Sequence, residues 1–137
     1  MKQPLSPEQA LIYAMITIAA VDRNISDNEL KRIGSSVKDL PAFAKYNEDD
    51  LVEDSQVCGA ELSKPDGLEI VLERIREGLP PRLHETAYAL SAEIAATDLS
   101  VKAEEIRFLE LLAERLKLDK LTCAALERGA RARHQKA

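Results

Sequence analysis

One stretch determines the fold: Ala19-Ala-Val-Asp22-Arg-Asn-Ile25-Ser-Asp-Asn-Glu29-Leu-Lys-Arg-Ile33. A diverged copy follows 76 positions later (98 − 22 = 76) as Ala95-Ala-Thr-Asp98-Leu-Ser-Val101-Lys-Ala-Glu-Glu105-Ile-Arg-Phe-Leu109. Both copies have the pattern Ala-Ala-x-Asp-x-x-(Ile/Val)-x-x-x-Glu. In each copy an apolar helical run ends in a short acidic turn, and a second helical run follows. The sequence therefore predicts two related helix–turn–helix hairpins.

Helical patterns continue through the rest of the chain, and no segment shows the alternation of a strand. The run from Ala10 to Val21 is apolar almost all round, which is typical of a buried central helix. Its repeat mate runs from Pro81 to Thr97. We expect an all-α fold: a single domain over residues 1–137 with about seven helices, in which the repeats 10–40 and 83–117 are related by a pseudo-twofold axis.

Several predicted helices begin with capping residues. Ser6 with Gln9, and Ser26 with Glu29, have the spacing of a capping box, in which two side chains satisfy two backbone N–H groups. Asp119 is an N-cap candidate for the last helix. These spacings predict helix starts near residues 7, 27 and 120.

Apolar periodicity also predicts which side chains are buried. Ile18 and Ile94 occupy matching positions in the two most apolar helices, so we expect both to be fully buried. Ile25 and Val101, the β-branched residues of the turns, are expected to fill the core between the hairpins. Glu93 is expected to face solvent. The other inward positions are Leu30, Ile33, Val37, Leu40, Leu51, Val52, Ser55, Cys58, Leu62, Leu68, Val71, Leu72, Ile75, Leu83, Ala87, Leu90, Ala95, Ile106, Leu109, Leu112, Ala113, Leu116, Leu121, Ala125, Leu126 and Gly129.

The net charge of −5 makes nucleic acid an unfavourable partner. The longest apolar run, at 10–21, is too short to insert into a membrane, and the first residues lack the apolar core of a secretion signal. We therefore expect a cytoplasmic protein.

The acidic residues from Glu48 to Asp54 are typical of a solvated helix start, and the alternative is a docking surface for a basic partner.

Motifs for catalysis are absent from the sequence: it contains no nucleophile elbow, phosphate loop or dinucleotide fingerprint. Cys58 and Cys123 lie 65 positions apart and have the pattern of small buried residues. His84 and His134 have no nucleophile or metal partner at a recognisable spacing, so both are expected at the surface. The basic end, residues 128–136, is expected to fray.

The first acidic turn resembles a calcium loop only at its start. Asp22, Asn24 and Ser26 place side-chain oxygens at alternate positions, as an EF-hand does. However, the sixth position holds Asp27 instead of glycine, and the twelfth holds Ile33 instead of glutamate. An EF-hand is therefore excluded.

A different metal geometry remains open. If the hairpins pack about a twofold axis, Asp22, Glu29, Asp98 and Glu105 converge, and four close carboxylates require a neutralising charge. A divalent ion of the oxygen-preferring kind, such as calcium, magnesium or manganese, meets this need. The alternative is purely structural: the same carboxylates cap helices and interact favourably with their dipoles.

The doubled hairpin resembles the tellurite-resistance TerB family. The resemblance extends over residues 9–125 in overall organisation and is specific at 19–33 and 95–116. It implies a small, all-helical, cytoplasmic protein with two similar halves, associated with resistance to tellurite and other stresses. It further implies metal binding by the acidic turn residues, here Asp22, Glu29, Asp98 and Glu105, and action beside a membrane-embedded TerC-type partner.

One feature departs from the family pattern. TerB proteins usually have glycine directly after the aspartate, where this chain has Arg23 and Leu99. Glycine adopts backbone angles that these residues resist, so the turns are expected to differ in shape.

The leading hypothesis is a non-enzymatic, TerB-like stress-response protein with a divalent-metal site at the two acidic turns. The first alternative is a metal-free helical module that binds a partner protein. A hydrolase-like metal enzyme ranks lowest, because no histidine lies near the acidic turns. The oligomeric state is left open by the sequence.

Overall fold

Seven α-helices make up the computed structural model, which describes residues 3–21, 25–97 and 101–137. The all-α prediction is confirmed, since these ranges contain no strand. In chain order the helices are α1 (Pro7–Ala20), α2 (Asp27–Asp39), α3 (Leu51–Leu62), α4 (Gly67–Gly78), α5 (His84–Ala96), α6 (Ala103–Leu116) and α7 (Lys120–His134), with short 3-10 turns η1 (Pro41–Phe43), η2 (Glu48–Asp50) and η3 (Pro81–Leu83).

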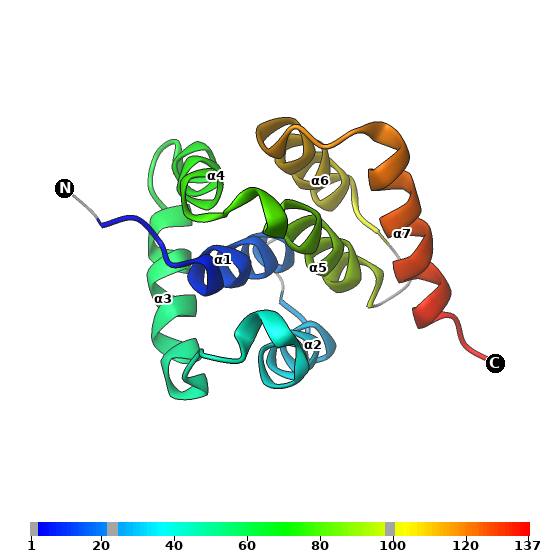
Figure 1. Ribbon diagram of the computed structural model, residues 1–137, viewed down its shortest axis with the longest axis horizontal. Coiled ribbons are helices and arrows are strands. Elements are labelled where there is room, and N and C mark those ends of the chain that lie inside the picture. The colour runs from blue at the N-terminus through cyan, green and yellow to red at the C-terminus, as the bar shows by residue number, and fades with distance from the viewer. Residues whose placement is uncertain (1–2, 22–24, 98–100) are drawn as a thin grey trace.

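The two most apolar helices, α1 and α5, pack against each other at the centre (Figure 1). α2 and α6 lie on opposite sides of this pair, while α3 and α4 cover α1, and α7 covers α5. Ile18 and Ile94 are 0% and 1% exposed, as predicted. α1 has only 14 residues, and no helix within the described ranges is long and apolar enough to cross a membrane.

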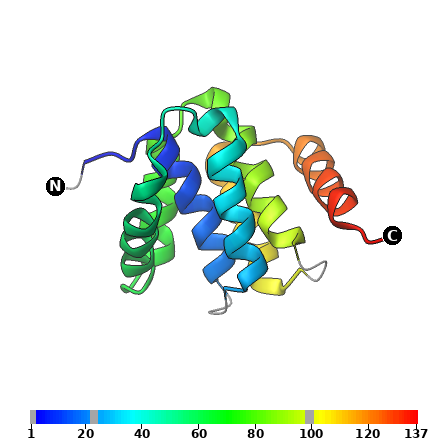
Figure 2. The same ribbon diagram turned by 90° about the horizontal axis from the view of Figure 1, so that it is seen from below.

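The 76-residue offset holds at the helix boundaries. α1 ends at Ala20 and α5 at Ala96, while α2 begins at Asp27 and α6 at Ala103 (96 − 20 = 76 and 103 − 27 = 76). These four helix ends lie at the same end of the molecule (Figure 2). The predicted helix–turn–helix hairpins are therefore present in both halves.

A third helix joins each hairpin at an equivalent position. The Thr17 hydroxyl of α1 lies 3.8 Å from the Cys58 sulfur of α3. Glu93, the repeat mate of Thr17 on α5, forms an ion pair with Arg133 of α7, and its Oε1 lies 2.6 Å from Nε2 of His134. Each half therefore contains three corresponding helices, and α4 lies outside the repeat.

Three expectations for the second half are wrong. The side chains of Glu93 and His134 are only 13% and 12% exposed, and α7 continues in regular form to His134. Burial alone would raise the pKa of Glu93, but hydrogen bonds from Arg133 and His134 outweigh this effect and hold the pKa below its ordinary value. The ionised carboxylate ties the end of α7 to α5, which the local sequence does not indicate.

Seven apolar side chains that were expected to be inward are exposed: Ile25, Leu30, Val52, Val101, Ile106, Leu121 and Ala125. The expectation that Ile25 and Val101 fill the core is therefore wrong. All but Ala125 lie in a turn or within the first four residues of a helix. Periodicity predicts the direction of a side chain, but burial also requires a neighbouring element at that height along the helix.

The sharp turn between α3 and α4 depends on two residues. Asp66 has φ 60°, in the left-handed region, and Gly67 follows it. A Cβ atom at Gly67 would lie 2.4 Å from the carbonyl oxygen of Leu62, so no larger residue fits there without moving the backbone. This turn lets α3 and α4 pack against each other and against α1.

Candidate functional site

The glutamates of the two acidic turns occupy equivalent capping positions. Oε1 of Glu29 accepts a hydrogen bond from the backbone N–H of Ser26 (2.8 Å), and the Ser26 hydroxyl accepts one from the N–H of Glu29 (3.1 Å). In the second copy, Oε1 of Glu105 accepts from the N–H of Lys102 (3.0 Å). A lysine ammonium cannot accept a hydrogen bond, so α6 has only this half of the capping box. Both glutamates are buried and satisfy a backbone N–H at a helix start.

The predicted metal-ligand set is only partly described. Asp22 and Asp98 lie outside the described residues, so their contribution to a metal site stays a prediction. Glu29 and Glu105 begin helices on opposite sides of the central pair (Figure 1). The described residues contain no group of three or more His, Cys, Asp or Glu side chains that could hold a metal ion. Each glutamate is placed to cap the start of its own helix, and a metal site formed by all four carboxylates stays a prediction.

A pocket of about 180 Å³ opens beside the second turn, between α5, α6 and α7. It is lined by Ala92, Ala95 and Ala96 of α5, whose small side chains leave space above the helix. Val101 and Ile106, which are 36% and 48% exposed, complete its apolar wall. A cavity of about 150 Å³ holds a benzene molecule, so this pocket has room for one large apolar side chain.

Polar groups surround the apolar part of this pocket. The Tyr88 hydroxyl donates a 2.6 Å hydrogen bond to Oε2 of Glu127, and Glu110 and Arg131 complete the lining. Burial and the neighbouring Glu127 carboxylate raise the pKa of Tyr88, so the phenol stays protonated as the donor. Sequence reasoning missed this pocket, although the run of alanines facing the second turn was the signal for it.

A second groove, of about 530 Å³, lies between the starts of α1 and α3 and is polar. Asp54 connects its two sides, because its carboxylate accepts hydrogen bonds from the Tyr46 hydroxyl (2.5 Å) and from Nε2 of Gln9 (3.1 Å). Asp50 and Glu53 line the groove and are exposed. The carboxylates of Asp50 and Glu53 are therefore solvated in the single molecule, as expected for an acidic helix start.

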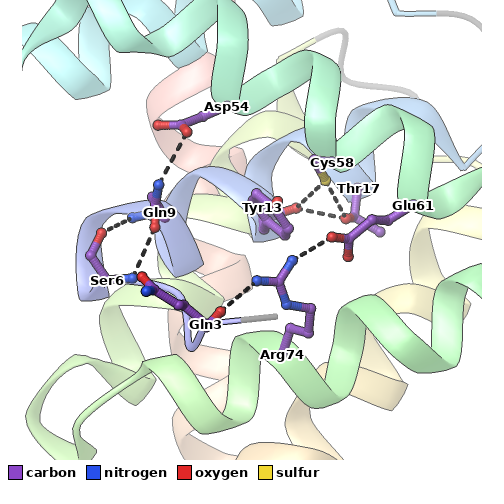
Figure 3. Close-up of polar contacts among 9 residues, drawn as sticks. All are labelled: Gln3, Ser6, Gln9, Tyr13, Thr17, Asp54, Cys58, Glu61 and Arg74. Atoms are coloured by element: carbon purple, nitrogen blue, oxygen red, sulfur yellow. Dashed lines mark hydrogen bonds and ion pairs between the residues drawn. The ribbon is translucent and has the colours of Figure 1, made fainter. Parts of the chain in front are cut away.

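A buried polar cluster joins α1, α3 and α4 (Figure 3). The Arg74 guanidinium forms an ion pair with Glu61, whose side chain is 2% exposed, and donates a 2.9 Å hydrogen bond to the carbonyl oxygen of Gln3. The same guanidinium lies 5.7 Å from the centre of the Tyr13 ring. Sequence reasoning missed this ion pair, and the only local sign was an acid at position 61, three residues after Cys58 on the inward face.

The described thiols and imidazoles are not arranged for nucleophilic catalysis. Burial raises the pKa of Cys58 to about 12 and also raises that of Cys123, and both residues are buried, as predicted. His84 is half-buried, with Nε2 3.4 Å from the carbonyl oxygen of Leu79, while His134 contacts Glu93. Within the described ranges, neither histidine has a hydroxyl or thiol as its hydrogen-bond partner.

These features define an all-α protein with a doubled hairpin and a pocket beside its second turn. Residues 3–130 match the model of a family described as protein of unknown function, DUF533, and the chain belongs to this family. The chain has no match among curated proteins or among solved structures.

Proposed function

We propose that this chain is a TerB-like, non-enzymatic protein of the cytoplasm that acts in resistance to tellurite and related stresses by binding a partner protein. The resemblance of the two hairpins to the TerB family supports the biological setting. The pocket beside the second turn supports binding, because Val101 and Ile106 leave apolar surface exposed around a hollow of side-chain size. The buried, protonated thiols support a role without catalysis.

The proposed partner is a protein of the TerC type, embedded in a membrane, as the family resemblance implies. One large apolar side chain from a cytoplasmic segment of the partner fills the pocket, and Arg131 and Glu110 contact its polar surroundings. Buried anchors of this kind contribute most of the affinity in many protein interfaces.

The first prediction tests this interface with Ile106→Glu. A carboxylate beside the apolar pocket would lose water when the partner binds, so affinity for a detergent-solubilised TerC-type protein should fall about tenfold or more. Ile70→Glu is the matched control: Ile70 is also partly exposed, at 39%, but lies on α4, away from the pocket. Titration calorimetry with the three proteins measures the effect. Equal affinities for all three would show that the pocket is not the interface.

A divalent ion at the acidic turns is the second candidate function. The observation in its favour is the equivalent burial of Glu29 and Glu105 at the same position of the two repeats. Asp22 and Asp98 would supply further oxygen ligands. The cap hydrogen bonds described above engage Oε1 of both glutamates, and a metal ion would bind their other oxygen, Oε2.

The second prediction tests this metal site. If the site exists, calcium, magnesium or manganese at about millimolar concentration raises the melting temperature, because binding to the folded state alone stabilises it. Asp22→Asn combined with Asp98→Asn then abolishes the response. If the acidic residues act only on helix starts, the melting temperature is unchanged by metal and the double variant is modestly less stable. Thermal denaturation with each metal and with a chelator separates these outcomes.

A further inference from the structure

The helices α3 and α7 lie at opposite ends of the long axis of the molecule (Figures 1 and 2). Each covers a central helix with its inner face and leaves its outer face without a neighbour in the described structure. On the outer side of α3, Val52 and Val57 are 67% and 44% exposed, and because they are five positions apart they lie about 140° from each other around the helix. The outer face of α7 carries Leu121, 80% exposed, and the small residue Ala125 one turn later.

The charges beside these apolar residues are opposite in sign. Around the outer face of α3, Asp49, Asp50 and Glu53 are exposed, and no basic residue occurs between residues 48 and 62. We call this surface the acidic face. Around the outer face of α7, Lys120, Arg128 and Arg131 are exposed. We call this second surface the basic face.

The acidic side chains within α7 are few. Glu127 is the only one between residues 120 and 134, and it accepts the hydrogen bond of Tyr88. Asp119, directly before α7, is also exposed, so the basic face carries the three cations Lys120, Arg128 and Arg131 against this one carboxylate. Two basic faces repel each other, and so do two acidic faces, whereas one face of each kind attracts.

We propose that the basic face of one molecule binds the acidic face of a second copy of the same chain, head to tail. Leu121 of one copy then packs near Val52 of the other, while carboxylates pair with ammonium and guanidinium groups around them. The exposed Ala124 and Ala125 allow the two helices to approach closely. This interface is heterologous, so each added molecule still presents one acidic and one basic face. Because these faces lie at opposite ends of the long axis, the assembly extends beyond a dimer.

The proposed self-association does not depend on the pocket beside the second turn. Arg131 lines that pocket and also belongs to the basic face, but Ile106, Val101 and the alanines of the pocket lie on α5, α6 and the second turn, and neither Lys120 nor Arg128 lines it. Loss of partner binding in Ile106→Glu would therefore leave the self-association intact.

Two doubly substituted chains test the proposal. Asp50→Lys with Glu53→Lys makes the acidic face basic, and Lys120→Glu with Arg128→Glu makes the basic face acidic. Sedimentation velocity is measured for the full chain from about 1 µM to about 500 µM, in salt of about 0.05 M and about 0.5 M. Far-ultraviolet circular dichroism confirms that each variant is folded.

Wild-type protein should associate with rising concentration, forming species larger than dimers, and should dissociate at high salt. Each variant alone should bind itself about tenfold or more weakly, because like charges then face each other. An equimolar mixture of the two variants should associate again, since it restores pairing of opposite faces. A monomeric wild type at low salt, or a mixture that remains monomeric, would overturn the proposal.

Two neutral substitutions keep the test valid if a charge reversal disturbs folding. Val52→Ser and Leu121→Ser change side chains that are mostly exposed in one molecule, so they should weaken association without lowering the melting temperature. Leu30→Ser, at a half-exposed position on α2, is the control and should associate like the wild type. Association lost equally in all three variants would place the contact elsewhere and contradict the proposal.

Discussion

Arg74→Met should destabilise the protein by about 3–5 kcal/mol, the range found when one partner of a buried ion pair is removed. Glu61 is almost completely buried, and its carboxylate loses its guanidinium neighbour in this variant. The variant also loses the hydrogen bond to the Gln3 carbonyl and the contact with the Tyr13 ring. Chemical denaturation, which gives the free energy of unfolding, measures the loss.

The double variant Glu61→Gln with Arg74→Met separates two causes of the lost stability: the unpaired buried charge of Glu61 and the other lost contacts of Arg74. It leaves no ion in the cluster, so much of the lost stability should return. Arg76→Met, which removes an exposed guanidinium two positions away, should leave the denaturation midpoint close to that of the wild type. If the double variant is as unstable as Arg74→Met, the lost contacts of Arg74 outweigh the buried charge.

Ile18→Ala should cost about 2–5 kcal/mol, because it removes buried methyl groups and leaves a cavity in the middle of the core. Ile18 is 0% exposed and lies on α1, which α3, α4 and α5 cover. These neighbours hold the helix from several sides, so the cavity has little room to collapse. Urea denaturation with an unchanged m-value would show that the loss is one of stability alone.

Ile25→Ala provides the comparison for this core variant. Ile25 is 39% exposed beside the first turn, so its truncation should cost much less than that of Ile18. Similar losses for the two variants would contradict the arrangement in which α1 is the buried central helix.

Features that depend on residues close in sequence were predictable. Ser26 and Glu29 are three positions apart, and their spacing alone predicts the capping box that the structure contains. The repeat of Ala20 and Ala96 as helix ends follows from the constant offset in the same way. Local hydrogen bonds determine these features, so neither required knowledge of the tertiary packing.

Features that depend on distant neighbours were not predictable. The sequence around Glu93 predicts a side chain that faces solvent. Arg133 and His134, about 40 positions away, reach it only because α7 packs on α5. Val52 was expected to be inward from the apolar pattern of its segment, yet it is 67% exposed. The pocket beside the second turn likewise depends on distant neighbours. Both α6 and α7 pack on α5, and the alanines of α5 line the space between these two helices.

The contrast between Thr17 and Glu93 indicates why the repeated sequence pattern is recognisable only around the turns. The glutamate that caps each second helix forms its hydrogen bond within one hairpin, so the same residue suits both copies. The side chains at 17 and 93 instead face a third helix, and that helix presents a thiol in one half and a guanidinium and an imidazole in the other. Each position therefore carries a side chain that suits the third helix of its own half. The two halves are thus alike in architecture but no longer interchangeable, since a hairpin moved to the other half would meet a third helix of the wrong chemistry.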